Sequence, residues 1–95
     1  MRLDLFLKAS RLCPRRTIAQ KLCDAGVVSI NGTPAKSAHP VRSGDEITLR
    51  RRDQLVRIRV LALPASKQAS REEAGALYEH LSSEPVGHDQ ALQDS

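Results

Sequence analysis

The 95-residue sequence predicts one small α+β domain, in which two N-terminal helices precede a small antiparallel sheet and a C-terminal amphipathic helix. Three observations predict this class. Apolar residues recur at helical spacing up to Gly26 and at every second position after it. The dipeptide Asn31-Gly32 is a strong signal for a hairpin turn. A chain this short buries only about 60–65% of its unfolded surface, so a large enclosed active site is not expected.

The first helix is expected over residues 3–12. Its apolar residues recur at helical spacing, while Asp4, Lys8 and Arg11 form a separate charged stripe at i, i+4 and i+7. Asp4 precedes Lys8 by four residues, which is the favourable order for a helical ion pair worth a few tenths of a kcal/mol. We therefore expect a mostly buried helix with one charged stripe.

A second helix is expected to follow and to end at Gly26, because glycine readily adopts the left-handed conformation that ends helices. Pro14 suits its first position, since the N–H group that proline lacks would have no partner there. Thr17-x-x-Gln20 matches a capping box and offers a competing start.

Four strands are expected after Gly26. Asn31-Gly32 joins the first two, and Pro34 keeps the second at a sheet edge, because proline cannot donate a ladder hydrogen bond. Ser43-Gly44-Asp45 marks the next turn, and a basic loop, Arg50 to Arg52, joins the last two strands. The apolar positions of the alternating runs are Val28, Ile30, Ile47, Leu49, Val56, Ile58 and Val60.

A third helix is expected near the C-terminus. Ser70-x-x-Glu73 is a capping box, and the apolar residues Ala74, Leu77, Tyr78 and Leu81 follow at i, i+3, i+4 and i+7. We expect residues 64–82 to form a linker and a helix docked on the domain through these side chains. Residues 83–95 have no periodicity and are predicted to be a disordered tail.

The charge distribution is asymmetric. Residues 1–62 hold 13 Lys and Arg against 5 Asp and Glu, a net charge of +8, whereas residues 63–95 hold 2 against 6, a net charge of −4. Such a basic surface on a small unit indicates binding of a polyanion, with rRNA, tRNA, DNA and an anionic membrane all open on this ground alone. The only aromatic residues are Phe6 and Tyr78, so base stacking on aromatic platforms is not expected.

No catalytic constellation is present in the sequence. His39, His80 and His88 fall in different elements, none has metal-ligand spacing to a cysteine, and no phosphate-binding glycine-rich loop occurs. We therefore expect no enzyme activity, no metal and no cofactor.

Cys13 and Cys23 are expected to be packing residues. They lie ten positions apart and form no Cys-x-x-Cys motif, and the N-terminus lacks the features of a signal peptide. No stretch approaches the roughly 20 apolar residues that span a bilayer. These features indicate a reduced, cytoplasmic protein.

The basic residues of the helical part are the candidate RNA-binding set. Arg15 and Arg16 fall at a helix start, where positive charge costs about 0.3–1 kcal/mol each, so we expect an anionic ligand to meet them there. Lys36 and the loop from Arg50 to Arg52 either extend this track or are solvated. The full candidate set is Arg2, Lys8, Arg11, Arg15, Arg16, Lys21 and Lys36.

Several short motifs occur in order over residues 1–50: Arg2-Leu3-Asp4, Arg16-Thr17-x-Ala19, Gly26, Val28-x-Ile30-Asn31-Gly32 and Val41-x-x-Gly44-Asp45. Together they resemble the RNA-binding domain first seen in ribosomal protein S-four. The resemblance implies a domain over residues 1–63 whose two helices and following hairpin lie on structured RNA. It also implies that arginines and lysines of this stretch contact phosphates.

The opening MRLDLFLKASRLCPRRT, Ser70-Arg71-Glu72-Glu73-Ala74 and Tyr78 are similar to the RqcP family of ribosome-associated quality control proteins. This resemblance implies binding to the large ribosomal subunit obstructed by peptidyl-tRNA, with contacts to 23S rRNA and tRNA. It further implies support of alanine tailing of the stalled nascent chain by RqcH. The residues that it carries over are Arg2, Asp4, Lys8, Arg15 and Arg16.

Other functions stay open at this point. A ribosome-associated heat-shock protein that rescues large subunits carrying tRNA is the second relative, although its basic C-terminal extension is missing here. A DNA-binding helix pair would need base-reading side chains, for which only Gln20 and Lys21 qualify. A protein-interaction module would not need the charge of +8.

Asp4 is predicted to orient a neighbouring arginine, with plain pairing along its own helix as the alternative. We expect the free protein to gain nothing from Arg15 and Arg16. Arg16→Gln would then leave thermal stability unchanged or slightly raised. The alternative is that Arg16 is tied to an acid such as Asp4 and serves the fold.

Overall fold

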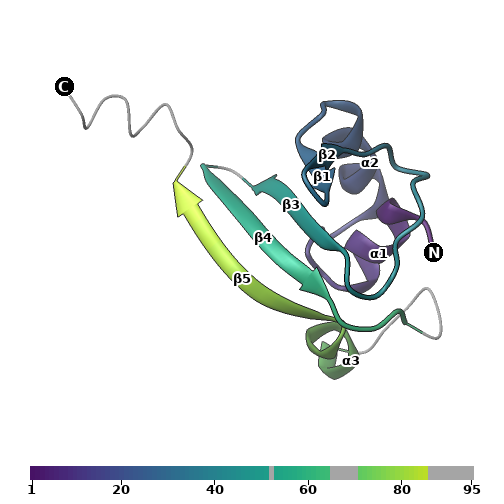
Figure 1. Ribbon diagram of the computed structural model, residues 1–95. Helices are drawn as coiled ribbons and strands as arrows, with labels where there is room; N and C mark the ends of the chain where they lie inside the picture. Colours follow the sequence, from purple (N-terminus) through teal and green to yellow (C-terminus); the bar gives the residue numbers. More distant parts are fainter. Residues whose placement is uncertain (52, 65–70, 86–95) are drawn as a thin grey trace.

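The structure, a computed structural model, describes residues 1–51, 53–64 and 71–85. Two helices pack together beside a five-stranded antiparallel sheet, whose last two strands extend away from them (Figure 1). The strand order is β2-β1-β3-β4-β5. The elements are α1 (Leu3–Ala9), α2 (Arg16–Asp24), β1 (Val28–Ile30), β2 (Thr33–Pro34), β3 (Glu46–Arg51), β4 (Gln54–Val60), α3 (Arg71–Ala76) and β5 (Tyr78–Pro85). The predicted α+β class is confirmed.

Helix α1 is buried on most of its surface, and the side chains of Leu3, Phe6 and Leu7 are completely inaccessible to solvent. The helix is shorter than expected. It ends at Ala9, and Arg11 adopts the left-handed conformation with φ +62°. A residue other than glycine rarely takes this conformation, which costs it roughly 1 kcal/mol.

Helix α2 begins at Arg16, so the predicted start at Pro14 is wrong. Arg15 is extended, with φ −141° and ψ 149°, and its carbonyl accepts a hydrogen bond from the N–H of Ala19. The extended conformation of Arg15 interrupts the helix that Pro14 would start. The capping box is wrong as well, because no side chain caps α2 and Gln20 makes a different contact, described below.

The local turn signals are confirmed. Gly26 has φ +76°, and the N–H groups of Gly26 and Val27 bond to carbonyls of the last turn of α2. Asn31 and Gly32 have φ +52° and +86°, as a type I′ turn requires, and they join β1 to β2. Pro34 lies on the edge strand β2, where its missing N–H interrupts no ladder.

The hydrophobic core lies between the helical pair and one face of the sheet. Strand residues alternate as predicted, and β3 pairs with β4 in a register that places Ile47 opposite Ile58 and Leu49 opposite Val56. The buried strand residues are Val28, Ile30, Ile47, Leu49, Val56, Ile58 and Val60. The other face of the sheet carries polar and charged side chains.

The predicted third helix is present but ends early, and the part predicted beyond Leu77 is wrong. Helix α3 covers only residues 71–76, and residues 78–85 form β5, which pairs antiparallel with β4 through an irregularity between Arg57 and Ile58. Gly75 weakens the helix from within, and pairing with the open edge of β4 satisfies the backbone of eight residues. Ala74 and Leu77 are buried, whereas Tyr78 and Leu81 are only half-buried.

Residues 83–85, expected in a tail, belong to β5. The remainder of that predicted tail, residues 86–95, and the predicted cap at Ser70 lie outside the described residues. Within the described part of the chain, no helix has the length and apolar character that crossing a membrane requires.

Candidate nucleic-acid interface

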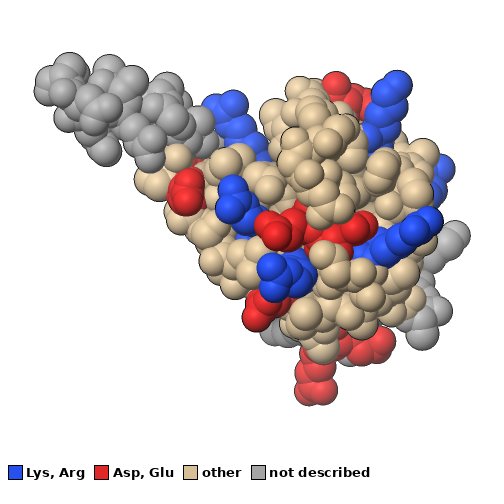
Figure 2. All heavy atoms as spheres, in the orientation of Figure 1, with Lys and Arg blue, Asp and Glu red and all other residues tan. Residues whose placement is uncertain are grey.

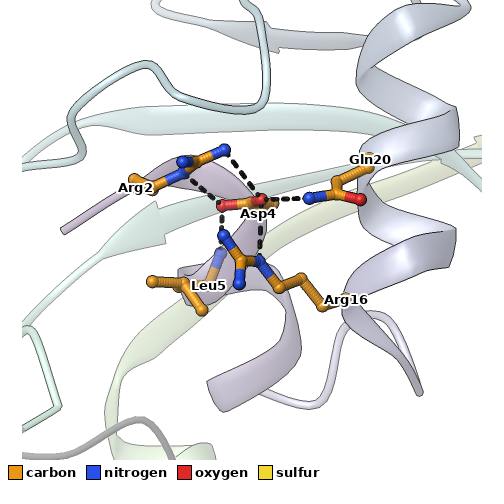
Figure 3. Close-up of polar contacts among 5 residues, drawn as sticks. All are labelled: Arg2, Asp4, Leu5, Arg16 and Gln20. Carbon is orange, nitrogen blue, oxygen red and sulfur yellow. Dashed lines mark hydrogen bonds and ion pairs between the residues drawn. The ribbon is translucent and has the colours of Figure 1, made fainter.

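A buried carboxylate, Asp4 on α1, organises the basic N-terminal part of the protein (Figure 3). Its Oδ1 atom accepts hydrogen bonds from Nε of Arg2 at 3.2 Å and from the backbone N–H of Leu5 at 2.8 Å. Its Oδ2 atom accepts from Nε of Arg16 and from Nε2 of Gln20, both at 3.0 Å, and from Nη2 of Arg2 at 3.3 Å. Asp4 is itself 0% exposed. We call Arg2, Asp4 and Arg16 the arginine pair site.

The start of α1 is held by the loop before Val41, which fixes the position of Asp4. The N–H of Leu3 bonds to the carbonyl of His39, and the N–H of Asp4 bonds to the carbonyl of Ser37. These bonds replace a side-chain cap, which α1 lacks. Arg2, the residue before α1, also forms an isolated β-bridge with Pro40. The backbone on both sides of the Asp4 carboxylate is therefore fixed.

The environment of Asp4 favours its charged form. Burial raises the pKa of its carboxyl, but hydrogen bonds from Gln20 and Arg16, the charge of Arg16 and the bond from Arg2 lower it by more. The pKa of Asp4 therefore lies below its ordinary value of 3.8. Asp4 is thus a carboxylate at neutral pH, held between two guanidinium groups.

Arg16 is tied to Asp4, which is the arrangement that the alternative role of Arg16 in the fold requires. The Nε–Oδ2 distance is 3.0 Å, and the buried carboxylate supplies the negative charge that the start of α2 otherwise lacks. Asp4 makes its ion pairs with Arg2 and Arg16 and not, among the described contacts, with Lys8. The alternative in which Arg16 serves the fold therefore has a structural basis.

Both arginines keep donors for another acceptor. Asp4 takes only the Nε–H of Arg16, while a guanidinium has five N–H groups. The side chains of Arg2 and Arg16 are 43% and 41% exposed. Two guanidinium charges and one carboxylate leave the site with a net charge of +1. Such a site can hold a singly charged phosphodiester through the Nη groups.

The other predicted site residues are spread over the helical half of the molecule. Lys8 is half-buried at the end of α1, and Arg11 and Arg15 are exposed in the connection to α2. Lys36 is exposed next to Ser37, whose carbonyl holds Asp4. Lys21 lies in the last turn of α2, at the opposite end from Arg16, so the structure does not bring these two together.

Acidic side chains offset part of the positive charge of the arginines on the outer face of the sheet. On the side of the molecule seen in Figure 2, Lys and Arg are interspersed with Asp and Glu. Arg59 on β4 lies 3.6 Å from Glu46 on β3 and 3.6 Å from Glu79 on β5. Arg50 is exposed, and the side chains of the following two arginines are outside the described part.

Gln20 is the site residue that the sequence analysis missed. It lies one turn after Arg16 on α2, and this i, i+4 spacing was the available signal. The capping-box interpretation assigned its side chain to the backbone at Thr17 instead. Local patterns along one helix therefore did not reveal the partner of Gln20, which is Asp4 on α1.

Besides the arginine pair site, the described residues contain two buried cysteines but no metal-binding cluster. Cys13 and Cys23 are buried thiols, as expected of packing residues, and burial raises the pKa of Cys23 to about 11, aided by the charge of Asp4. A thiol with this pKa stays protonated at neutral pH. Residues 1–51, 53–64 and 71–85 contain no group of three His, Cys, Asp or Glu that could hold a metal ion.

Comparisons with known proteins agree with this geometry. Residues 1–47 match the S4 domain, the S-four-type domain that the motifs resemble. The RQC P-site tRNA stabilizing factor of Bacillus subtilis is 45% identical over 87 residues, which cover 92% of this chain and 99% of that protein. The factor of the same name from Halalkalibacterium halodurans is 41% identical over 86 residues, or 90% and 96% of the two chains.

A solved structure has the same fold. Heat Shock Protein 15 of Vibrio cholerae superposes with a TM-score of 0.78 at 32% identity, covering 86% of this chain and 82% of that one. The identity to the two tRNA stabilizing factors is higher, and the match spans nearly all of both chains. This protein therefore belongs to the S4-domain family whose curated members are named RQC P-site tRNA stabilizing factor.

Proposed function

We propose that this protein is an RNA-binding adaptor of ribosome-associated quality control. It binds rRNA and tRNA on the large ribosomal subunit obstructed by peptidyl-tRNA, and it supports alanine tailing of the stalled nascent chain by RqcH. The observation that carries the proposal is the buried Asp4 with Arg2 and Arg16 held around it. The printed name of its relatives, a P-site tRNA stabilizing factor, supplies the ribosomal setting.

The adaptor works by positioning and performs no chemistry. Arg2 and Arg16 are oriented before RNA arrives, because Asp4 holds each of them through Nε. A phosphate that docks there meets donors that have already lost most of their rotamer freedom, so binding costs less entropy. In this proposal Arg11, Arg15, Lys8 and Lys36 extend the track along the RNA backbone.

The proposed partners are the large subunit with its 23S rRNA, a tRNA in the P site and RqcH. We place the protein in the cytoplasm, where these partners act. The weak capacity of its side chains to read bases fits binding by shape and phosphate contacts, with little sequence preference.

A second candidate is rescue of large subunits in the manner of the heat-shock relative, whose fold is similar at 32% identity. Residues 63–95 carry a net charge of −4, so this segment is not the basic extension that we associate with that role. A protein-interaction module without RNA binding is the candidate of another class. A module of that kind would not require the net charge of +8 that residues 1–62 carry.

Sedimentation of the protein with ribosomal particles tests the proposal. We expect the protein in the large-subunit fraction of a sucrose gradient, together with tRNA, and not with free 70S ribosomes. Arg2→Gln should release it from that fraction. Arg57→Gln makes the same charge change at an exposed arginine on β4 and serves as the matched control.

Two results would contradict the proposal. One is a protein that stays at the top of the gradient while large subunits carrying peptidyl-tRNA are present. The other is an equal loss of binding in Arg57→Gln and Arg2→Gln, which would indicate general charge attraction without a specific arginine pair site.

A further inference from the structure

The sheet ends in strand β5, whose outer edge has no partner strand in the described part of the chain (Figure 1). This edge runs over the eight residues Tyr78–Pro85. The strand at the other end of the sheet, β2, has only two residues and includes Pro34. A long unpaired edge is a template for another strand, and proteins commonly block such edges with lysine or proline. Strand β5 contains no lysine, and its proline is its last residue.

The first part of β5 turns backbone groups outward at alternate residues. The N–H of Leu61 bonds to the carbonyl of Leu77 at 2.8 Å, so these two residues face each other. Residues of an antiparallel ladder alternate between the two sides of the strand. Glu79 therefore faces β4, whereas the N–H and C=O groups of Tyr78 and His80 point to the open edge.

The alternation resumes after the irregularity of β5. Leu55 and Leu61 face the same side of β4, because β4 pairs with β3 without a register shift. Glu84 lies opposite Leu55, so it faces β4. The N–H of Ser83 consequently points to the open edge, as does Pro85, where the missing N–H interrupts no ladder. Backbone donors and acceptors are thus available on both sides of the irregularity.

Charges alternate across the outer face of the sheet and end in an acid at this edge. Glu46 on β3 and Glu79 on β5 each lie 3.6 Å from Arg59 on the strand between them. Glu84 shares a face with Glu79, because their partners on β4, Leu55 and Arg59, are an even number of residues apart. Glu84 makes no ion pair among the described contacts. A strand added beside β5 would therefore meet two carboxylates on this face.

Charge decides which occupant suits the open edge. RNA is disfavoured, because residues 63–95 carry a net charge of −4 and α3, beside the start of β5, adds Glu72 and Glu73. A second copy of the chain is disfavoured as well. Full antiparallel pairing of β5 with itself would place Glu79 opposite Glu84 of the second copy, and like charges in that position are unfavourable.

We propose that the open edge of β5 docks an extended, basic segment of a partner protein, which adds a strand to the sheet. The outward backbone groups of Tyr78, His80 and Ser83 form the ladder, and two Lys or Arg side chains of the segment pair with Glu79 and Glu84. These two cations lie about four residues apart, so that both reach the same face. The alternate side chains of the segment pack beside Tyr78, which is half-buried against the core.

This docking surface goes beyond the proposed RNA contact. Strand β5 lies on the side of the sheet away from α2, which carries Arg16 of the arginine pair site (Figure 1). The protein then has two surfaces of opposite charge, one for RNA and one for a basic protein segment.

A short synthetic peptide tests the proposal on the full-length free protein. The probe is Thr-Lys-Val-Thr-Val-Lys-Thr with blocked termini, whose lysines share one face of a strand, and the control peptide has glutamate in both lysine positions. Amide ¹H–¹⁵N NMR follows each titration. We expect the N–H signals of Tyr78, His80 and Ser83 to shift and to exchange more slowly with the lysine peptide. The control peptide should bind there at least about tenfold more weakly.

Three variants identify the contacts. Glu84→Lys should weaken binding of the lysine peptide about tenfold and strengthen binding of the glutamate peptide at the same amides. Glu72→Lys makes the same charge change on α3, outside the ladder, and should bind within about twofold of wild type. His80→Pro removes an outward N–H without removing a donor to β4, so it should reduce binding about tenfold or more. If His80→Pro does not fold, the charge exchange at Glu84 still decides the question.

Several results would overturn the inference. They are equal binding of the two peptides at β5, shifts confined to other elements, and a Glu84→Lys variant that binds both peptides like wild type. Shifts of the β5 amides that grow with protein concentration alone would assign the edge to a second copy, and shifts caused by RNA would assign it to the RNA surface. The peptide titration contains no ribosome, so its outcome is independent of whether the proposed function holds.

Discussion

Arg16 on α2 donates its Nε–H to Oδ2 of Asp4 on α1 across 3.0 Å, twelve residues apart in the chain. Asp4 is fully buried, whereas 41% of the Arg16 side chain is exposed. The ion pair therefore joins the two helices on its inner side and presents a guanidinium to solvent on its outer side. One arginine serves both the fold and the proposed RNA contact.

Arg16→Gln should therefore lower both stability and RNA affinity. Asp4 keeps its bonds from Arg2 and Gln20, and Arg16 is partly solvated, so we expect the free energy of unfolding to fall by only about 1 kcal/mol. Affinity for the large subunit should fall by about 1–3 kcal/mol. Urea denaturation and equilibrium binding measure the two effects. An unchanged midpoint with unchanged m-value would show that the pair contributes nothing to the fold.

The pH dependence of stability should report Asp4. Its folded-state pKa lies below 3.8, so its stabilising contribution is complete above pH 3.8 and is lost as the pH falls through the lowered value. Asp4→Asn should lower the free energy of unfolding by about 2 kcal/mol at neutral pH. The gap between wild type and Asp4→Asn should then narrow below pH 3.8. A gap that stays constant through acid pH would contradict the charged-carboxylate interpretation.

Arg11 adopts φ +62°, a conformation that glycine adopts freely and that alanine adopts only at a cost of about 1 kcal/mol. Arg11→Gly and Arg11→Ala both remove the side chain, so their difference isolates the backbone. We expect Arg11→Gly to be more stable than Arg11→Ala by about 1 kcal/mol in chemical denaturation. Equal stability of the two variants would mean that the connection between α1 and α2 relaxes out of the left-handed region.

The strand assignment of residues 78–85 separates two leucines that the helical prediction treats alike. Leu77 is 5% exposed between α3 and β5, whereas Leu81 lies at the irregularity of β5 and is half-buried. Leu77→Ala should cost about 2–4 kcal/mol of unfolding free energy, and Leu81→Ala about 1 kcal/mol or less. Equal losses, measured by urea denaturation, would favour the helix.

Binding to RNA should be strongly dependent on salt. With about four to six phosphate contacts, the logarithm of the association constant should fall with the logarithm of the salt concentration at a slope of about −3 to −5. Arg2→Gln should make the slope less steep by about one unit, because it removes one phosphate contact. A slope near zero would exclude binding through phosphates.

Local sequence alone determined the features that depend on backbone conformation or on alternation. Gly26 ends α2 and Asn31-Gly32 makes the hairpin because few residues tolerate positive φ. Pro34 lies at the edge because it has no N–H to donate. The buried positions of β3 and β4 follow from the period of two, and the ordered motifs of residues 1–50 were enough to recognise the S4 domain.

Only the tertiary structure decided the features that depend on a partner distant in sequence. Residues 74–81 match a helical period, yet residues 78–81 belong to β5, because the open edge of β4 supplies hydrogen bonds along the eight residues of that strand. The sequence alone predicts that Arg16 is an unfavourable charge at a helix start and that Gln20 is part of a helix cap. In the folded protein both side chains instead donate to Asp4 on α1. A buried carboxylate must collect its donors wherever the fold provides them, and spacing along one helix cannot reveal which donors those are.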